Sequence, residues 1–328
     1  MRLLYITDTH IRGTSPQNRK DNFPETLRAK MKEVILLAKK HRVHALLHGG
    51  DLFDTPSPAL AVCSGFIPIL AEAGVPLYAI AGNHDLFGHN PLTLDRTMLG
   101  FLNRLGVVRL LRDEEPTYLE QHGIKVQLSG RNYHYDMDRR SPEEDYLVQK
   151  KDCDFAVHLV HGMLYDKKLP EGVPHTLIDK ITHTEADVTI SGHNHLGFQA
   201  TRINGRLFLN PGSLVRLSNH PAEIKRKPAA LLLEFTPNGV NYQYLQLKSA
   251  PPGEEVLDRT AIEQAAFQEE KLAEFVKGIK SSGEFQNLVI DEIIQSLADK
   301  KGVSKAVREG ALARIAAARQ RLEVDGSE

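Results

Sequence analysis

The first 250 residues of the chain alternate short apolar runs with stretches whose apolar side chains recur at helical spacing. Residues 27–38 and 58–73 show this helical spacing, and Gly74 ends the second stretch. The apolar runs predict buried strands at residues 3–6, 43–47, 77–80, 155–160 and 188–190. Strands that alternate with helices in this way predict an α/β fold.

Each predicted strand ends in a cluster rich in Asp, Asn, His and Gly. The clusters are Asp8-Thr9-His10, Gly49-Gly50-Asp51, Gly82-Asn83-His84-Asp85, His161-Gly162 and Gly192-His193-Asn194-His195. Taken singly, the weaker clusters are explained as well by a capping aspartate or a glycine turn. Because ligands of α/β sheets bind beyond the carboxyl ends of the strands, five such clusters together predict one shared site.

The sequence changes character after the last cluster. Residues 231–235 and 240–244 flank Thr236-Pro237-Asn238-Gly239, which predicts an antiparallel hairpin. Pro251-Pro252-Gly253 then marks a boundary, and apolar side chains at helical spacing follow it. We therefore predict one domain over residues 1–250 and a C-terminal helical module over residues 254–328.

Composition and charge narrow the class of protein. The 328 residues include 41 basic and 42 acidic ones, so the net charge of −1 argues against a purely electrostatic binder of nucleic acid. The tail after Gly253 holds 11 basic and 15 acidic residues, which leaves 30 and 27 in the remainder and makes the first domain mildly basic.

No window of the sequence is apolar enough to span a membrane. Two cysteines, Cys63 and Cys153, cannot build a disulfide framework, and the first residues are typical of a strand and not of a signal peptide, so we expect a cytoplasmic protein.

The five clusters offer imidazole, carboxylate and amide ligands without a thiolate. Such ligands suit manganese, iron or zinc, and two cations about 3.5–4 Å apart can clamp a phosphoryl group and activate water. In their order along the chain these motifs, followed by Asn210-Pro211-Gly212-Ser213, resemble the calcineurin-like metallophosphoesterases. The resemblance implies an α/β fold built as a four-layer α-β-β-α sandwich. It also implies two divalent metal ions, for which we expect Mn²⁺, with Fe²⁺ or Zn²⁺ as alternatives.

The resemblance also assigns the metal ligands, and it places Asp51 as the bridge between the two ions. One ion would be held by Asp8, His10 and His195, and the other by Asn83, His161 and His193.

Two further residues receive catalytic roles from the resemblance. His84 matches a histidine that faces the leaving oxygen in the family, and Asp54 matches the carboxylate that orients this histidine. Asp85 is the alternative orienting group, and a helix-capping role for Asp54 stays open.

The substrate is predicted from finer features of the motifs. Asp51-Leu52-Phe53-Asp54 and Gly82-Asn83-His84-Asp85 resemble the SbcD-type DNA-repair nucleases more than the protein phosphatases, which carry an arginine where Thr55 stands. We expect a metal-dependent phosphodiester hydrolase that acts on DNA as an exonuclease or endonuclease. Arg12 and Arg19 lie in a loop after the first ligands, where they could bind a backbone phosphate or stay solvated. The alternatives are a small-molecule phosphodiesterase or phosphatase, such as a cyclic-nucleotide phosphodiesterase, and a non-catalytic binding module.

Partners are predicted mainly from the tail. SbcD-type nucleases carry a DNA-capping domain and an ATPase-binding segment after the catalytic domain. The helical tail stands in that place here, and it predicts a cap, a docking element for an SbcC-like coiled-coil ATPase, or a homodimerisation element. An apolar stripe falls in a region that dimerises in the SbcD branch, with an ordinary core face as the alternative; it comprises Leu94, Met98, Phe101, Leu102 and Leu105.

Among the remaining candidates, His134 and Arg216 could contact the substrate, and His48 and His158 are expected to be hydrogen-bonded core side chains.

Overall fold

The computed structural model describes residues 1–113, 115–260, 264, 271 and 303–314. The chain divides into two compact units, Met1–Arg259 and Thr260–Glu328. In the second unit residues 305–314 are helical. Most of the helical module predicted over residues 254–328 lies outside the described residues, and the module and its roles stay predictions.

The first unit contains two six-stranded sheets. The first sheet has the order β14-β13-β1-β2-β3-β4, in which β1 to β4 run parallel and the hairpin of β13 and β14 closes one edge antiparallel. Its strands are β1 (Arg2–Ile6), β2 (Ala45–His48), β3 (Leu77–Ala79), β4 (Arg109–Leu110), β13 (Ala229–Thr236) and β14 (Gly239–Gln246). The hairpin turns where the sequence predicts, with Thr236 paired to Gly239.

The second sheet has the order β11-β12-β10-β7-β6-β5, with four parallel strands inside and an antiparallel strand at each edge. Its strands are β5 (Thr117–Gln121), β6 (Ile124–Arg131), β7 (Phe155–Val160), β10 (Val188–Ser191), β11 (Phe198–Ile203) and β12 (Arg206–Asn210). All five strands predicted from apolar runs are present. They belong to two sheets: β1, β2 and β3 to the first, and β7 and β10 to the second.

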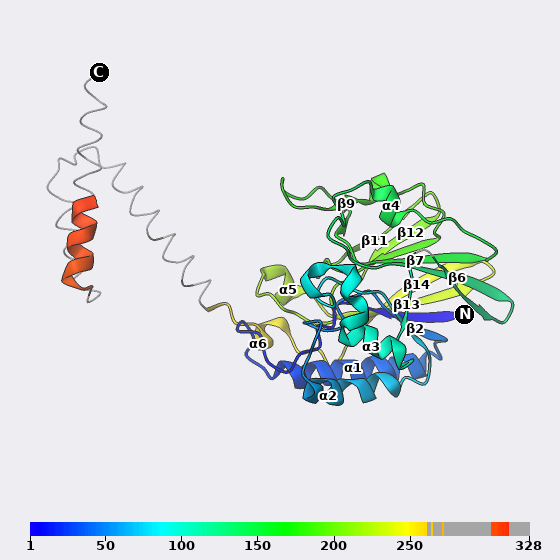
Figure 1. The fold of residues 1–328 in the computed structure, drawn as a ribbon, viewed down its shortest axis with the longest axis horizontal. Coiled ribbons are helices and arrows are strands. Elements are labelled where there is room, and N and C mark those ends of the chain that lie inside the picture. The colour runs from blue at the N-terminus through cyan, green and yellow to red at the C-terminus, as the bar shows by residue number, and fades with distance from the viewer. Residues whose placement is uncertain (114, 261–263, 265–270, 272–302, 315–328) are drawn as a thin grey trace, which may run out of the picture. The chain divides into compact units, whose positions relative to one another are not determined.

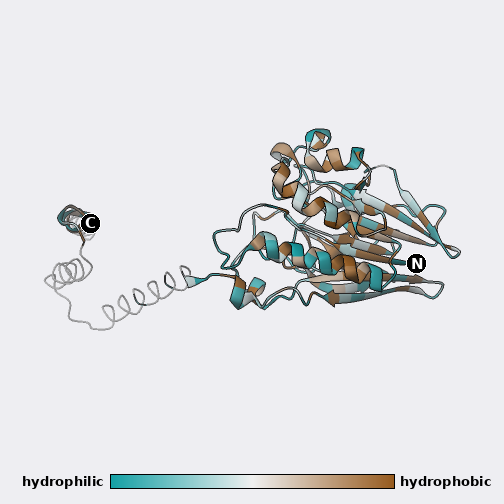
Figure 2. Ribbon diagram, turned by 90° about the horizontal axis from the view of Figure 1, so that it is seen from below, coloured by the Kyte–Doolittle hydropathy of each residue, from teal (hydrophilic) through white to brown (hydrophobic). Residues whose placement is uncertain are grey.

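The two sheets pack face to face, and alternate residues of each strand point to opposite faces of its sheet. Leu3 and Tyr5 of β1 meet Leu159 of β7 in the core between the sheets, whereas Leu4 and Ile6 face the helices on the other side. Figure 1 shows α1 and α2 side by side on one side of the sheets and α4 on the other. In Figure 2 the strands are largely apolar and α1 is hydrophilic on one face and apolar on the other, whereas α2 contains no charged residue.

The helical layers differ between the two outer faces. The first sheet is covered by α1 (Phe23–Lys40), α2 (Leu60–Ala71) and α3 (Met98–Arg104). The outer face of the second sheet is covered by short elements, namely α4 (Pro142–Tyr146), the parallel pair β8 (Leu164–Tyr165) and β9 (Thr176–Leu177), and the turn Ile178–Lys180. The predicted four-layer α-β-β-α sandwich is therefore confirmed, with a fourth layer made of short segments.

The apolar stripe at α3 is split between the core and the surface. Leu102 is buried, and Leu94 and Met98 are partly buried against the core. Phe101 and Leu105 are 51% and 59% exposed. An ordinary core face therefore explains only part of the stripe.

Among the described residues, none of the helices is both long and apolar enough to cross a membrane.

Candidate metal centre

The carboxyl ends of five strands from the two sheets meet at one place, and each brings the polar cluster that the sequence marks. Several of the side chains are attached to strained backbone, since Asp8, His10, Asp51 and His193 all have positive φ, between 43° and 67°. Residues other than glycine rarely adopt this conformation, and it is typical of functional sites that the surrounding fold holds in place.

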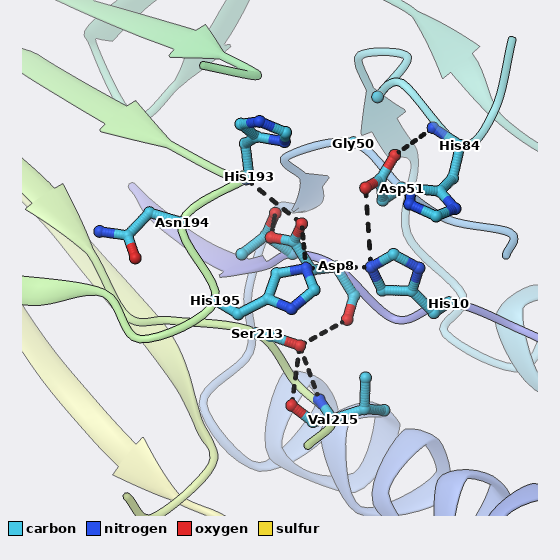
Figure 3. A network of polar contacts seen from close by, with 12 residues as sticks. Asp8, His10, Gly50, Asp51, His84, His193, Asn194, His195, Ser213 and Val215 are labelled. Atoms are coloured by element: carbon cyan, nitrogen blue, oxygen red, sulfur yellow. Dashed lines mark hydrogen bonds and ion pairs between the residues drawn. The ribbon is translucent and has the colours of Figure 1, made fainter. Parts of the chain in front are cut away.

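A first group of ligand atoms comes from both sheets. Asp8, His10, Asp51 and His195 each offer one nitrogen or oxygen atom within 4.8 Å of the others. The two histidine Nε2 atoms lie 3.1 Å apart, and His195 Nε2 lies 3.5 Å from Asp8 Oδ1. Figure 3 shows these side chains pointing toward one another between the strand ends.

A second group shares one carboxylate with the first. Asp51, His161 and His193 also place ligand atoms within 4.8 Å of one another. Asp51 Oδ2 lies 3.4 Å from His161 Nε2 and 3.6 Å from Nε2 of His10, which belongs to the first group. Asn83 Oδ1 lies 3.2 Å from the same His161 nitrogen. The structure thus brings together all seven residues that the sequence predicts as ligands, with Asp51 between the two groups.

The charge of the site fits metal ions. Asp8 and Asp51 are both almost fully buried, and burying two neighbouring carboxylates is unfavourable unless positive charge compensates them. Burial alone would raise the pKa of Asp51, but the neighbouring His161 outweighs this effect and holds the pKa of the carboxyl below its usual range. Burial likewise opposes the hydrogen bond and charge of His195, which lower the pKa of Asp8. Ionised carboxylates with imidazole nitrogens and an amide oxygen form a donor set typical of a transition-metal or zinc centre.

Backbone groups orient the ligands. His161 Nδ1 lies 2.7 Å from the carbonyl oxygen of Gly49, and a proton donated there leaves Nε2 free to bind a cation. The backbone N–H of His84 donates to Asp51 Oδ1 at 2.8 Å, and the N–H of His193 donates to Asp8 Oδ1 at 3.2 Å.

One glycine is required by this packing. Gly50 has φ +96°, and a Cβ atom there would lie 2.3 Å from His161 Nδ1. The glycine before Asp51 therefore allows the close approach of the two sheets at the site.

His84 and Asp54 lie beside the first group. His84 Nδ1 is 3.0 Å from the backbone oxygen of Asp54, and its ring packs edge-on against His10 at 4.8 Å between centroids. The Asp54 carboxylate lies 3.4 Å from His10 Nδ1 and 3.0 Å from Arg12 Nη1. Asp54 thus faces His84 with its carbonyl group, while its carboxylate faces His10 and Arg12.

Asp85 acts on the backbone. It is fully buried, and its carboxylate accepts hydrogen bonds from the N–H groups of Leu52, Phe53 and Gly82. Burial and the nearby Asp51 raise its pKa to about 7. Asp85 joins the turn after β2 to the turn after β3, a role that the sequence alone did not suggest because the three donors are main-chain groups.

The remaining candidates have structural partners. His134 pairs with the buried Asp145 at 3.0 Å, Arg19 donates to Asp21 and to the carbonyl of Arg216, and the Arg216 guanidinium donates to the carbonyls of Arg226 and Pro251. His48 and His158 are buried and hydrogen-bonded, as predicted. Ser213, in the predicted closing motif, donates its hydroxyl to the carbonyl of Asp8.

The fold and this site define a metal-dependent phosphoesterase. The sequence profile of the calcineurin-like phosphoesterase family matches residues 1–197, and the chain belongs to this family. The resemblance inferred from the motifs is therefore confirmed.

Several characterised relatives carry names from DNA repair. The DNA double-strand break repair protein Mre11 of Haloferax volcanii is 27% identical over 262 residues, which cover 76% of this chain and 53% of that protein. The double-strand break repair protein MRE11 of Encephalitozoon cuniculi is 23% identical over 333 residues, or 90% of this chain and 56% of that protein. A subunit of the nuclease SbcCD from Escherichia coli is 33% identical over 107 residues, or 31% of this chain and 25% of that protein. The chain thus spans about half the length of the first of these relatives.

Among solved structures, the chain is similar to TT1561 of Thermus thermophilus, with a TM-score of 0.45 and 16% identity over 74% of this chain and 98% of that one.

Proposed function

We propose that this metal-dependent phosphoesterase holds two divalent ions and hydrolyses phosphodiester bonds of DNA. The position of Asp51 Oδ2 between His10 Nε2 and His161 Nε2 is the observation that carries the two-metal part of the proposal. We expect Mn²⁺ at both positions, with Fe²⁺ or Zn²⁺ as alternatives. When bound, two such ions supply Lewis acidity toward the phosphoryl group and a hydroxide nucleophile at neutral pH.

The chain's own residues prepare the site for this chemistry. Asp8, His10 and His195 would hold one ion, and Asn83, His161 and His193 the other. The strained turns fix the ligands before the substrate arrives, so little reorganisation accompanies the reaction.

His84 is proposed to donate a proton to the leaving oxygen. Its Nδ1 is occupied by the Asp54 carbonyl, so Nε2 remains as the group that can carry this proton. The ring is exposed at the edge of the site, where a substrate can reach it. Asp54 would act less directly, because its carboxylate faces His10 and Arg12.

DNA as substrate is supported by the repair nucleases and repair proteins among the relatives and by the charge beside the site. The Arg12 side chain is 30% exposed, and its guanidinium is held at the metal-site edge by Asp54, where it can contact a backbone phosphate next to the cleaved one. The mildly basic first domain is compatible with a polyanionic substrate, since the attraction needs only to be local.

Two protein partners are proposed, an ATPase and a second copy of this chain. A partner subunit is proposed because one relative is named as a subunit of a nuclease, SbcCD, and the resemblance to the SbcD-type nucleases implies that this partner is a coiled-coil ATPase. A homodimer is proposed because Phe101, Leu105 and the 88% exposed Leu92 leave apolar surface near α3. Cytoplasmic location stays a prediction from the sequence.

Activity assays on the purified full chain test the proposal. With Mn²⁺ present, we expect hydrolysis of bis-p-nitrophenyl phosphate and cleavage of end-labelled single- or double-stranded DNA. Hydrolysis of the small diester without cleavage of either DNA would contradict the nuclease assignment and favour a small-molecule phosphodiesterase. Two bound ions with no hydrolysis of either substrate would indicate a binding module.

A further inference from the structure

Five consecutive carbonyl groups in residues 213–217 each accept a hydrogen bond from a side chain elsewhere in the chain. This segment directly follows the Asn210-Pro211-Gly212 turn. Arg226 donates to the carbonyls of Ser213 and Val215, both at 2.6 Å. The donors to the next positions are Lys30 for Leu214 (3.0 Å), Arg19 for Arg216 (3.0 Å) and Asn18 for Leu217 (2.7 Å).

Three of the donors, Lys30, Arg19 and Arg226, are basic side chains that are mostly buried. Lys30 is only 1% exposed, and burial together with the nearby Arg19 lowers its pKa well below the ordinary value. Arg19 is paired with Asp21, and Arg226 with Glu223. Buried cations are expensive unless they are hydrogen-bonded, and bonds from a charged donor are stronger than neutral ones. The chain therefore uses the buried side chains of Lys30 and Arg19 and the mostly buried Arg226 to fix one short stretch of backbone.

The fixed stretch contacts one half of the metal centre. The Ser213 N–H donates to the carbonyl of His195 at 3.0 Å, and the one Ser213 hydroxyl proton is shared between the carbonyls of Asp8 at 2.9 Å and Val215 at 2.8 Å. The Leu214 N–H donates to the carbonyl of Thr7 at 3.0 Å, which fixes the residue before Asp8. Figure 3 shows Ser213 directly beneath Asp8 and His195. Both contacted residues belong to the same predicted metal position.

We propose that Arg226 is a positioning residue for the metal held by Asp8, His10 and His195, and that it acts through Ser213. Arg226 follows directly after the short helix α5 (Pro221–Lys225), and its two bonds to the carbonyls on either side of Leu214 determine where Ser213 lies. Residues that orient metal ligands from outside typically contribute 10- to 100-fold to metal affinity. The inference rests on the proposed two-metal site but not on DNA as substrate.

Calorimetric titration of the metal-free full chain with Mn²⁺ tests this role. For Arg226→Gln we expect one of two binding events to weaken by roughly 10-fold or more, while the other keeps the wild-type affinity. Arg226→Lys keeps a charged donor and should recover part of the loss. Arg202→Gln is the matched control, because Arg202 also donates to two carbonyls, those of Gly205 and Val240, at the end of β11 away from the site. It should bind both ions as the wild type does.

The outcomes separate a positioning role from a structural one. Two wild-type affinities in Arg226→Gln would overturn the proposal even if the melting temperature fell. If Arg226→Gln does not fold, Ser213→Ala removes the hydroxyl that contacts the Asp8 carbonyl and the backbone of Val215, and it should weaken the same single event; unchanged affinities there would also overturn the proposal. A wild type that binds only one ion would contradict the two-metal function instead.

Discussion

The site lies between the carboxyl ends of the parallel strands of the first sheet, which we call the first edge, and those of the second sheet, the second edge. The two edges contribute different chemistry. The edge of the first sheet brings both buried carboxylates, Asp8 and Asp51, together with His10 and Asn83. The edge of the second sheet brings imidazoles, from His161, His193 and His195. The negative charge of the site therefore comes from one sheet, and most of the neutral ligands come from the other. Neither edge alone forms a complete ligand group, so the site exists only when the sandwich is assembled.

The two edges are also held differently. The first is tied internally, since Asp85 accepts three hydrogen bonds from the turns after β2 and β3. The ligands of the second edge are held by the first: His161 bonds to the Gly49 carbonyl, and the His193 N–H donates to Asp8. The first edge thus acts as the template on which the second edge is placed.

Asp51→Asn should have the largest effect, because Asp51 serves both ligand groups. Replacing its carboxylate removes charge from both metal positions, and we expect loss of both ions and a fall in turnover of at least about a thousand-fold. His193→Ala is the comparison from the second edge and should lose one ion only. Elemental analysis of the purified variants measures both results. Two full equivalents of metal in Asp51→Asn would show that the bridging assignment is wrong.

His84→Ala should separate catalysis from metal binding on the first edge. His84 is not among the predicted ligands, so the variant should keep both ions, while turnover of bis-p-nitrophenyl phosphate should fall about 10²- to 10³-fold. Steady-state kinetics with metal analysis checks this. Unchanged turnover would remove His84 from the mechanism.

The ligands of both edges were predictable from sequence. Each ligand belongs to a polar cluster that follows an apolar run, and this local signal predicts both strand and ligand. What the local signal does not give is the distance between the two groups of ligands, because it depends on how the two sheets pack. Supporting contacts were not predictable, because they join residues far apart: Arg226 holds Ser213, and Asp85 binds main-chain groups that look alike in any sequence. The direction of the Asp54 carboxylate likewise depends on where Arg12 folds.

The stability that α4 contributes on the outer face of the second sheet should decrease in acid. Asp145 in α4 is buried, accepts hydrogen bonds from His134 and Arg140, and its carbonyl lies 2.9 Å from His158 Nε2 in β7. Burial would raise its pKa, but the bonds from His134 and Arg140 outweigh burial and lower the pKa to about 2. A lowered pKa stabilises the folded state above the unfolded value of 3.8, and this stability is lost as the pH falls through the folded value.

Asp145→Asn should therefore destabilise the protein by about 2 kcal/mol at pH 7 and by only about 1 kcal/mol at pH 3. Urea unfolding at both pH values gives the two free energies. Asp166→Asn, at an exposed aspartate, is the control and should match the wild type at both. An Asp145→Asn deficit that does not shrink at pH 3 would mean that shape, and not charge, holds α4 on the second sheet.

Arg12→Gln should have the smallest effect and should act on the substrate alone. The charge of Arg12 lies at the rim of the first edge, and losing one phosphate contact should raise the KM for DNA about three- to tenfold and reduce the slope of log affinity against log salt by about one. Hydrolysis of bis-p-nitrophenyl phosphate, which has no flanking phosphate, should stay near the wild-type rate, and Arg202→Gln should change neither substrate. Because Arg12 also pairs with Asp54, which faces His10, the metal content of the variant must be measured as well. Equal losses on both substrates together with a loss of metal would place Arg12 among the groups that support the first edge, and not among those that bind DNA.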